Sequence, residues 1–228
     1  MPDYKLVRTG RKTLAIYIRP NGEVEVRAPR RVSIQVIERA LREREDWILQ
    51  KQRALRSQYE KRQDFILTEG STLTLLGKEY PVIFGEAPGF DGACFTVPVG
   101  DFVQVRSLII QLYKKLAQEF LPERVRLYAG RTGLFPGSVR ISSAVSRWGS
   151  CSGKNTLSFS WRLMMAPPAA VDYVVVHELA HIKEHNHSSQ FWSLVESILP
   201  DYTEREKLLK DLQRKLSLEN WDVRSLQQ

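Results

Sequence analysis

The four histidines of the chain all lie between positions 177 and 187. Residues four apart on a helix share one face, with Cβ atoms about 5–6 Å from each other. His177 and His181 can therefore turn their imidazoles toward one metal ion, and zinc accepts imidazole nitrogen at roughly 2.0–2.1 Å. The motif His177-Glu178-Leu179-Ala180-His181 thus predicts a zinc site on a helix.

Glu178 lies about 100° further round the helix than His177, so it is poorly placed as a ligand beside the two histidines. It can instead reach a water molecule at the metal and remove its proton. This arrangement predicts metal-assisted hydrolysis with Glu178 as the general base.

A catalytic zinc usually has three protein ligands, and His185 and His187 compete for the third position. A continued helix would separate His185 from His177 by roughly 12 Å along its axis. His187 becomes a good ligand if the helix stops near His185-Asn186 and the chain turns back, because Asn186 tolerates left-handed backbone and Ser188 can cap a following helix. The geometry favours His187 and leaves His185 in solvent or in the cleft wall.

The elements that must carry this site alternate between β and α patterns. Period-two apolar runs around Pro20-Asn21-Gly22 predict a hairpin, and Ser33 can cap a helix whose charged face continues to Arg62. Further strands are expected over 73–84 and within 95–105. A helical pattern follows over 107–128, where Pro122 predicts a kink or two abutting helices. Short strands over 139–141 and 157–161 and three helices, the first opened by Pro167-Pro168, complete an α+β chain. We divide it into a β-rich module with a basic helix, residues 1–105, and a catalytic domain, residues 106–228.

Charge and cysteine content restrict the partners. Residues 1–62 hold 16 Lys and Arg against 8 Asp and Glu, whereas residues 63–228 hold 18 of each kind. This excess indicates either an anionic partner such as nucleic acid or a solvated helix face without a partner. Two distant cysteines, no apolar leader after Met1 and no apolar run long enough for a bilayer predict a cytoplasmic protein without a membrane partner.

Several stretches of the chain resemble the YgjP-like metallopeptidase family, and more distantly the SprT-like and Wss1-like DNA-associated proteases. The resemblance rests on Arg147-Trp148-Gly149-Ser150-Cys151, Leu157 to Leu163, Ala166-Pro167, Asp172 to His181, and Asn186-His187-Ser188 followed by Phe191-Trp192. It implies a minimal zincin-like domain, a small sheet with an active-site helix, in which His177, His181 and His187 bind zinc and Glu178 is the catalytic acid and base. The segment from Arg11 through Trp47 looks like the same family's leading hairpin and helix.

The resemblance also suggests residues that contact a substrate. In zincins a strand before the active-site helix forms the edge of the cleft, where an extended peptide adds by β-pairing, so Phe159 on the 157–161 strand is a candidate. The alternative is that this is an ordinary strand inside the sheet. Arg147 and Tyr202 are candidates for stabilising the oxyanion.

Three functions stay open on the sequence. The first is a zinc-dependent metallopeptidase that acts on exposed polypeptide segments. The second is a DNA-associated protease recruited by the basic residues 1–62. The third is a non-catalytic nucleic-acid-binding protein stabilised by zinc. The sequence does not identify the substrate or the oligomeric state.

Overall fold

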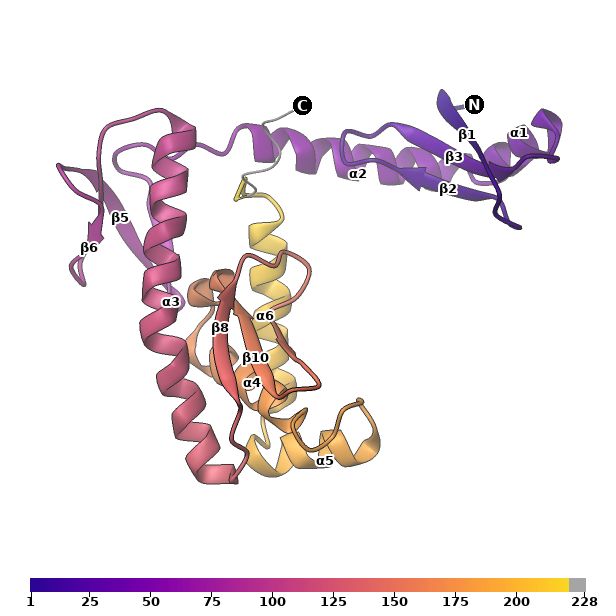
Figure 1. The fold of residues 1–228 in the computed structure, drawn as a ribbon. Coiled ribbons are helices and arrows are strands. Elements are labelled where there is room, and N and C mark those ends of the chain that lie inside the picture. Colours follow the sequence, from indigo (N-terminus) through magenta and orange to yellow (C-terminus); the bar gives the residue numbers. More distant parts are fainter. Residues whose placement is uncertain (222–228) are drawn as a thin grey trace. The chain divides into compact units, whose positions relative to one another are not determined.

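A computed structural model describes residues 1–221 of the chain. Helices and small mixed sheets occur together, which confirms the predicted α+β class (Figure 1). Two compact units are formed, one by Met1–Phe65 with Ser217–Asn220 and one by Ile66–Leu216 with Trp221. The sequence put a boundary after residue 105; compactness alone does not test which segments fold independently, so that boundary stays a prediction.

The first unit is built on the predicted hairpin. Strands β2 (Ala15–Ile18) and β3 (Val24–Pro29) pair antiparallel, and Gly22 in the turn has a φ of 85°, which glycine adopts without strain. A strand that the sequence pattern missed, β1 (Tyr4–Thr9), pairs in parallel with β3. Alternate β3 side chains pack on two helices, α1 (Ile34–Arg42) and α2 (Glu45–Gln63), and form a core with Ile37, Leu41 and Ile48.

The helical region of this unit differs from the single helix expected from Ser33 to Arg62. Ser33 does cap α1, because its Oγ accepts a hydrogen bond from the backbone N–H of Val36 at 3.4 Å. The chain then leaves helical geometry at Arg44, where φ is −119° and ψ is 16°, before α2 begins. The break lets α2 leave the small core, and Ile48 is its only buried residue.

The second unit contains two small sheets. Strands β4 (Thr72–Leu75), β5 (Lys78–Phe84), β6 (Gly89–Phe90) and β7 (Phe95–Val97) form a sheet in the order β4-β5-β7-β6. Strands β8 (Ser138–Ser142), β9 (Gly149–Cys151) and β10 (Thr156–Ser160) form a second sheet in the order β8-β10-β9. Strand β10 is therefore central and β9 is at an edge.

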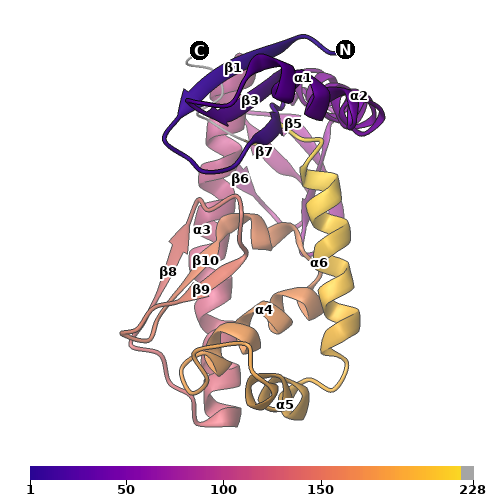
Figure 2. The ribbon, with the colours of Figure 1, turned by 90° about the vertical axis from the view of Figure 1, so that its right-hand side faces the viewer.

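Two of the helices of this unit contact the second sheet, and the last two helices of the unit pack on one of them. Helix α3 (Phe102–Thr132) runs without interruption through Pro122, and Asp101 caps its start by accepting from the N–H of Gln104 at 2.9 Å. A 3₁₀ turn η1 (Trp161–Met165) leads to α4 (Pro168–Ala180), followed by α5 (Ser189–Ile198) and α6 (Tyr202–Leu216). Helix α4 contacts β9, α5 and α6 (Figure 2). Within residues 1–221, no helix combines the length and apolar character that a membrane span requires.

Candidate metal centre and active site

Helix α4 carries the histidine motif in its last turn. Its sequence is apolar on nearly every side from Ala170 to Val176, and these residues are buried, as expected for a helix surrounded by other elements. Pro168 occupies the first turn, where the missing backbone N–H costs little. Because the helix is fixed on all sides, the direction of His177 and Glu178 is fixed with it.

Helix α4 ends earlier than the sequence predicted. It stops at Ala180 rather than near His185, and His181 is its C-terminal cap residue. The ring nitrogen Nδ1 of His181 lies 2.9 Å from the carbonyl oxygen of Glu184, which holds the turn that follows the helix. A carbonyl can only accept, so Nδ1 of His181 carries the proton and Nε2 presents a lone pair.

His187 returns to the helix through a short turn. Asn186 does not adopt the left-handed backbone that was expected; its Oδ1 instead accepts from the N–H of Ser188 at 3.1 Å. Ser188 caps α5 as predicted, accepting from the N–H of Phe191 at 3.4 Å. The turn brings His187 Nε2 to 3.0 Å from His177 Nε2.

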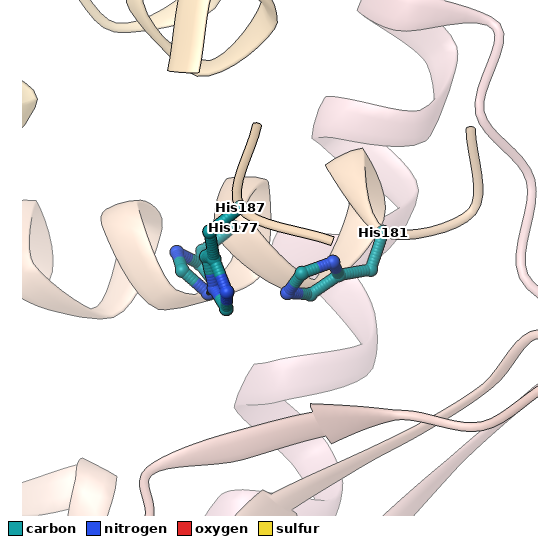
Figure 3. A group of neighbouring side chains, drawn as sticks. All are labelled: His177, His181 and His187. Atoms are coloured by element: carbon teal, nitrogen blue, oxygen red, sulfur yellow. Dashed lines mark hydrogen bonds between the residues drawn. The ribbon is translucent and has the colours of Figure 1, made fainter. Parts of the chain in front are cut away.

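The three imidazoles of His177, His181 and His187 converge. One ring nitrogen from each lies within 4.8 Å of the others, and Figure 3 shows the ring of His181 turned toward the other two. Phe191 packs against all three rings, with ring centroids 4.5–4.9 Å apart. His185 is not part of this cluster and lines the neighbouring cavity.

Burial keeps the imidazoles of His177 and His181 neutral. It is the largest cause that lowers the pKa of His177 to about 3, with further lowering by His181 and His187, and burial also lowers the pKa of His181. Metal binding needs the neutral ring, whose lone pair is free. Three converging imidazoles, two of them with nitrogens 3.0 Å apart, therefore fit a divalent metal ion.

Glu178 lies beside the cluster and is 5% exposed. Burial raises the pKa of its carboxyl to about 7, while the nearby Arg147 charge opposes this shift. A carboxylate with a pKa near the working pH is well suited to take up and release a proton. Gly149 makes room for it, because a Cβ added there would lie 2.6 Å from Glu178 Oε1.

Two cavities meet at this point. The first, which we name the α6-side cavity, has a volume of about 550 Å³ and extends between α4, α6 and the loop before β9. The second, the turn-side cavity, has a volume of about 500 Å³ and extends along Ser150–Gly153 toward His181, His185 and His187. Both are lined by Gly149, His177 and Glu178, so the two cavities flank the same chemical centre.

Comparison with known proteins identifies the family. The model of the YgjP-like, metallopeptidase domain matches residues 12–212, which is most of the chain. The chain belongs to the YgjP-like metallopeptidases. It is similar to a crystal structure of the metallopeptidase zymogen of Pyrococcus abyssi abylysin, at 23% identity over 44% of this chain and 98% of that chain, with a TM-score of 0.38. The comparison with curated proteins found no match.

The three residues expected to contact substrate in this YgjP-like metallopeptidase lie in different surroundings. Arg147 is exposed and lines the α6-side cavity. Phe159 lines neither cavity, because its side chain is 0% exposed and β10 has a partner strand on each side. Tyr202 stacks on Trp192, with ring centroids 5.4 Å apart, and lines neither cavity.

Other wall residues were not anticipated from the sequence. The edge strand that lines a cavity is β9, through Gly149 and Ser150, whereas the sequence led us to expect β10 at the edge of the cleft. Helix α6 supplies one wall of the α6-side cavity with five residues at helical spacing: Glu206, Leu209, Lys210, Gln213 and Arg214. That spacing is visible in the sequence, but nothing local indicates that this face lies beside α4.

A buried carboxylate anchors α4 in the metallopeptidase domain. Asp172 accepts from Arg124 Nε and Nη2, both at 2.7 Å, and from the Tyr128 hydroxyl at 3.0 Å. Arg205 Nη1 lies 3.9 Å from the same carboxylate. Asp172 thereby connects α4 to α3 and α6 about one and a half turns before His177.

Proposed function

We propose that this chain is a zinc-dependent endopeptidase in which His177, His181 and His187 hold the metal and Glu178 is the general base. The observation that carries the proposal is the convergence of three imidazole nitrogens within 4.8 Å beside a buried carboxylate. Membership of a metallopeptidase family supports the same interpretation of the site.

The donor set supports zinc as the metal. Neutral imidazole is a common zinc ligand, and three protein ligands with one open position are typical of catalytic rather than structural zinc. When bound, zinc would polarise the scissile carbonyl and lower the pKa of a water molecule toward about 7. The step that remains for this chain's own side chains is the transfer of one proton from the water to the leaving amine.

Glu178 would move that proton in two steps. Its carboxylate accepts a proton from the attacking water as the bond between the water oxygen and the carbonyl carbon forms. It then donates the proton to the leaving amine as the carbon–nitrogen bond breaks. The low exposure of Glu178, 5%, keeps bulk water away from the transferred proton.

The cavities support cleavage inside a polypeptide rather than at its end. The α6-side and turn-side cavities extend in two directions from Gly149, His177 and Glu178, which leaves room for substrate on both sides of the scissile bond. The edge strand β9 pairs only with β10 in the described sheet, so its outer edge offers backbone groups to an extended peptide.

The variant Glu178→Gln tests the proposal. We expect it to retain bound zinc and to lose roughly 10²- to 10⁴-fold of the peptidase rate on an unfolded protein such as casein, because the base is removed while the ligands stay. Glu196→Gln, an exposed change on α5, is the matched control. Full activity of zinc-loaded Glu178→Gln would refute the general-base assignment, and zinc binding without any activity of the unaltered protein would favour the non-catalytic alternative.

A second candidate function is recruitment of the peptidase to nucleic acid. The excess of 16 Lys and Arg over 8 Asp and Glu in residues 1–62 favours it, because Lys and Arg that neutralise phosphates supply the sequence-independent affinity for nucleic acid. Substrates would then be proteins bound to DNA. Salt-dependent binding of duplex DNA by the full chain tests this candidate.

The cysteines support a cytoplasmic location. Cys94 and Cys151 are both free thiols in the structure. Unpaired cysteines are typical of proteins kept in a reducing compartment. Fractionation of cells that produce the full chain, followed by immunoblotting, tests the location.

A further inference from the structure

The α6-side cavity has a wall that is unusual for the inner face of a helix. The residues of α6 that line the cavity have the spacing of one helical face: 206, 209, 210, 213 and 214. In a helix packed against a core, such a face would be apolar. Four of these five are polar or charged here, and only Leu209 is apolar. This face of α6 therefore lines a water-accessible space rather than a core.

The floor of the same cavity is apolar. Trp148, Tyr173, Val174 and Leu209 line it, and the last three are only 4–5% exposed. Burying an apolar side chain against such a floor stabilises a complex by about 25 cal/mol for each Å² removed from water. The cavity volume of about 550 Å³ is in the range of sites that bury most of a drug-sized ligand. The cavity therefore has room for more than a single side chain.

The rim of the cavity is positively charged. Arg147, Lys210 and Arg214 line it beside the carboxylate of Glu206, and Arg214 Nη1 also lies 2.9 Å from Asp211 Oδ1 in an ion pair whose two side chains are at least 68% exposed. Lys210 Nζ is 2.9 Å from Glu206 Oε2, but the two side chains are 59% and 41% exposed, so this ion pair is weak and can be exchanged for a substrate carboxylate. The rim thus favours an anionic group above an apolar floor.

The cavity also reaches the chemical centre. Its wall includes His177 and Glu178, so a peptide lying in it has a bond next to the proposed base. The turn-side cavity shares those two residues, but its remaining wall consists of the small residues 149–153 and further histidines, which offer neither an apolar floor nor a rim of Lys and Arg. Selectivity is therefore expected on one flank of the scissile bond.

We propose that the α6-side cavity is the specificity site for an extended polypeptide segment that carries an apolar side chain followed closely by acidic residues. The inference rests on the proposed peptidase function and names its substrate class. The apolar side chain contacts Trp148, Tyr173 and Leu209, and the acidic residues meet Lys210 and Arg214 at the rim.

Binding to the full-length Glu178→Gln protein tests the inference without turnover. The probes are fluorescein-labelled short alanine-based peptides with one leucine followed by Glu-Glu, Ser-Ser or Lys-Lys, and one Glu-Glu peptide in which serine replaces the leucine. We expect the Glu-Glu peptide to bind about tenfold more tightly than the Lys-Lys peptide, and replacement of its leucine to cost about tenfold. The difference between the charged peptides should shrink at high salt.

Charge reversal on α6 provides the decisive comparison. Lys210→Glu and Arg214→Glu, added singly and together, should weaken binding of the Glu-Glu peptide and strengthen binding of the Lys-Lys peptide. Lys207→Glu is the matched control, because Lys207 is exposed on the same helix and does not line the cavity. Equal affinity for the three charge variants of the peptide, or the same shift for Lys207→Glu as for Lys210→Glu, overturns the inference.

The outcomes separate this inference from the proposed function. Selective peptide binding by a protein that never cleaves peptides would remove the endopeptidase proposal and leave the binding site. Cleavage without selectivity, unchanged by Lys210→Glu, would leave the endopeptidase and remove the specificity site.

Discussion

At the scale of single residues, Gly149 packs closely against the side chain of the proposed base. A Cβ there would lie 2.6 Å from Glu178 Oε1 and 2.7 Å from its Cγ, which is closer than real Cβ contacts allow. We predict that Gly149→Ala displaces the carboxylate and lowers kcat by about 10²-fold, since misplacement by about 1 Å can cost that much. Steady-state kinetics and zinc analysis of the purified variant measure both effects.

The control for this prediction is Gly130→Ala. Gly130 lines neither cavity, and a Cβ there would meet nothing within 4 Å. Its kcat should equal that of the unaltered protein, and zinc should stay bound in both variants. If Gly149→Ala kept full activity, the packing of Gly149 against Glu178 would have no part in catalysis.

The choice of the proposed third metal ligand also concerns single residues. His187 Nε2 is 3.0 Å from His177 Nε2, whereas His185 lies outside the cluster and only lines the cavity. Loss of a residue that only hydrogen-bonds to a metal ligand typically lowers metal affinity by roughly 10- to 100-fold. We predict that His187→Ala lowers zinc affinity by more than this, and that His185→Ala changes it little. Competition with a chromophoric chelator measures both affinities, and equal losses would contradict the assignment of His187.

At the scale of elements, the position of α4 depends on Asp172. Arg124 donates two hydrogen bonds of 2.7 Å to its carboxylate, whose side chain is only 11% exposed. We predict that Asp172→Asn lowers the free energy of unfolding by about 2–4 kcal/mol, because the amide leaves the partly buried guanidinium without its charge partner. Urea unfolding followed by circular dichroism measures the change.

An exposed ion pair gives the comparison for Asp172. Asp211 Oδ1 lies 2.9 Å from Arg214 Nη1, with both side chains at least 68% exposed. Asp211→Asn should change the free energy of unfolding by less than about 1 kcal/mol. Similar losses in the two variants would mean that burial of Asp172 contributes nothing.

Local patterns predicted much of the framework. The hairpin at Asn21-Gly22, the Ser33 cap and the helix opened by Pro168 all follow from short-range preferences, and the structure confirms them. The end of α4 did not follow, because it depends on a bond between the His181 ring and the Glu184 carbonyl. The local pattern does not show that the ring of His181, a proposed metal ligand, also holds the turn that follows the helix.

Long-range packing accounts for the remaining differences. Strand order places β10 in the middle of its sheet, so Phe159 is buried, yet its alternating sequence fits an edge strand equally well. Val36 and Trp47 match the apolar helical spacing but are 42% and 49% exposed, because the chain breaks at Arg44 and only a small core is available. The wall that α6 supplies to the cavity depends on its contact with α4, which the sequence pattern does not contain.

At the scale of the whole molecule, the charge is divided unevenly between segments. The net charge of +8 arises within residues 1–62, which carry 16 basic and 8 acidic residues, while the segment with the histidine cluster is balanced. A protein that neutralises phosphates releases counterions, so its affinity for DNA falls steeply as salt rises. The second candidate function therefore makes a prediction that does not depend on the metal site.

We predict that the full chain binds short duplex DNA with an affinity that falls linearly with salt on a double-logarithmic plot. Arg30 and Arg31 are adjacent and exposed where β3 ends, so the double change Arg30→Ala, Arg31→Ala should make the slope shallower by about one for each phosphate that the variant no longer neutralises. Lys115→Ala, an exposed change on α3, should leave the slope unchanged. Fluorescence anisotropy at several salt concentrations measures these slopes. An absence of binding at low salt would mean that the basic surface of residues 1–62 is only solvated, and substrate choice would then rest on the cleft between α4, α6 and β9.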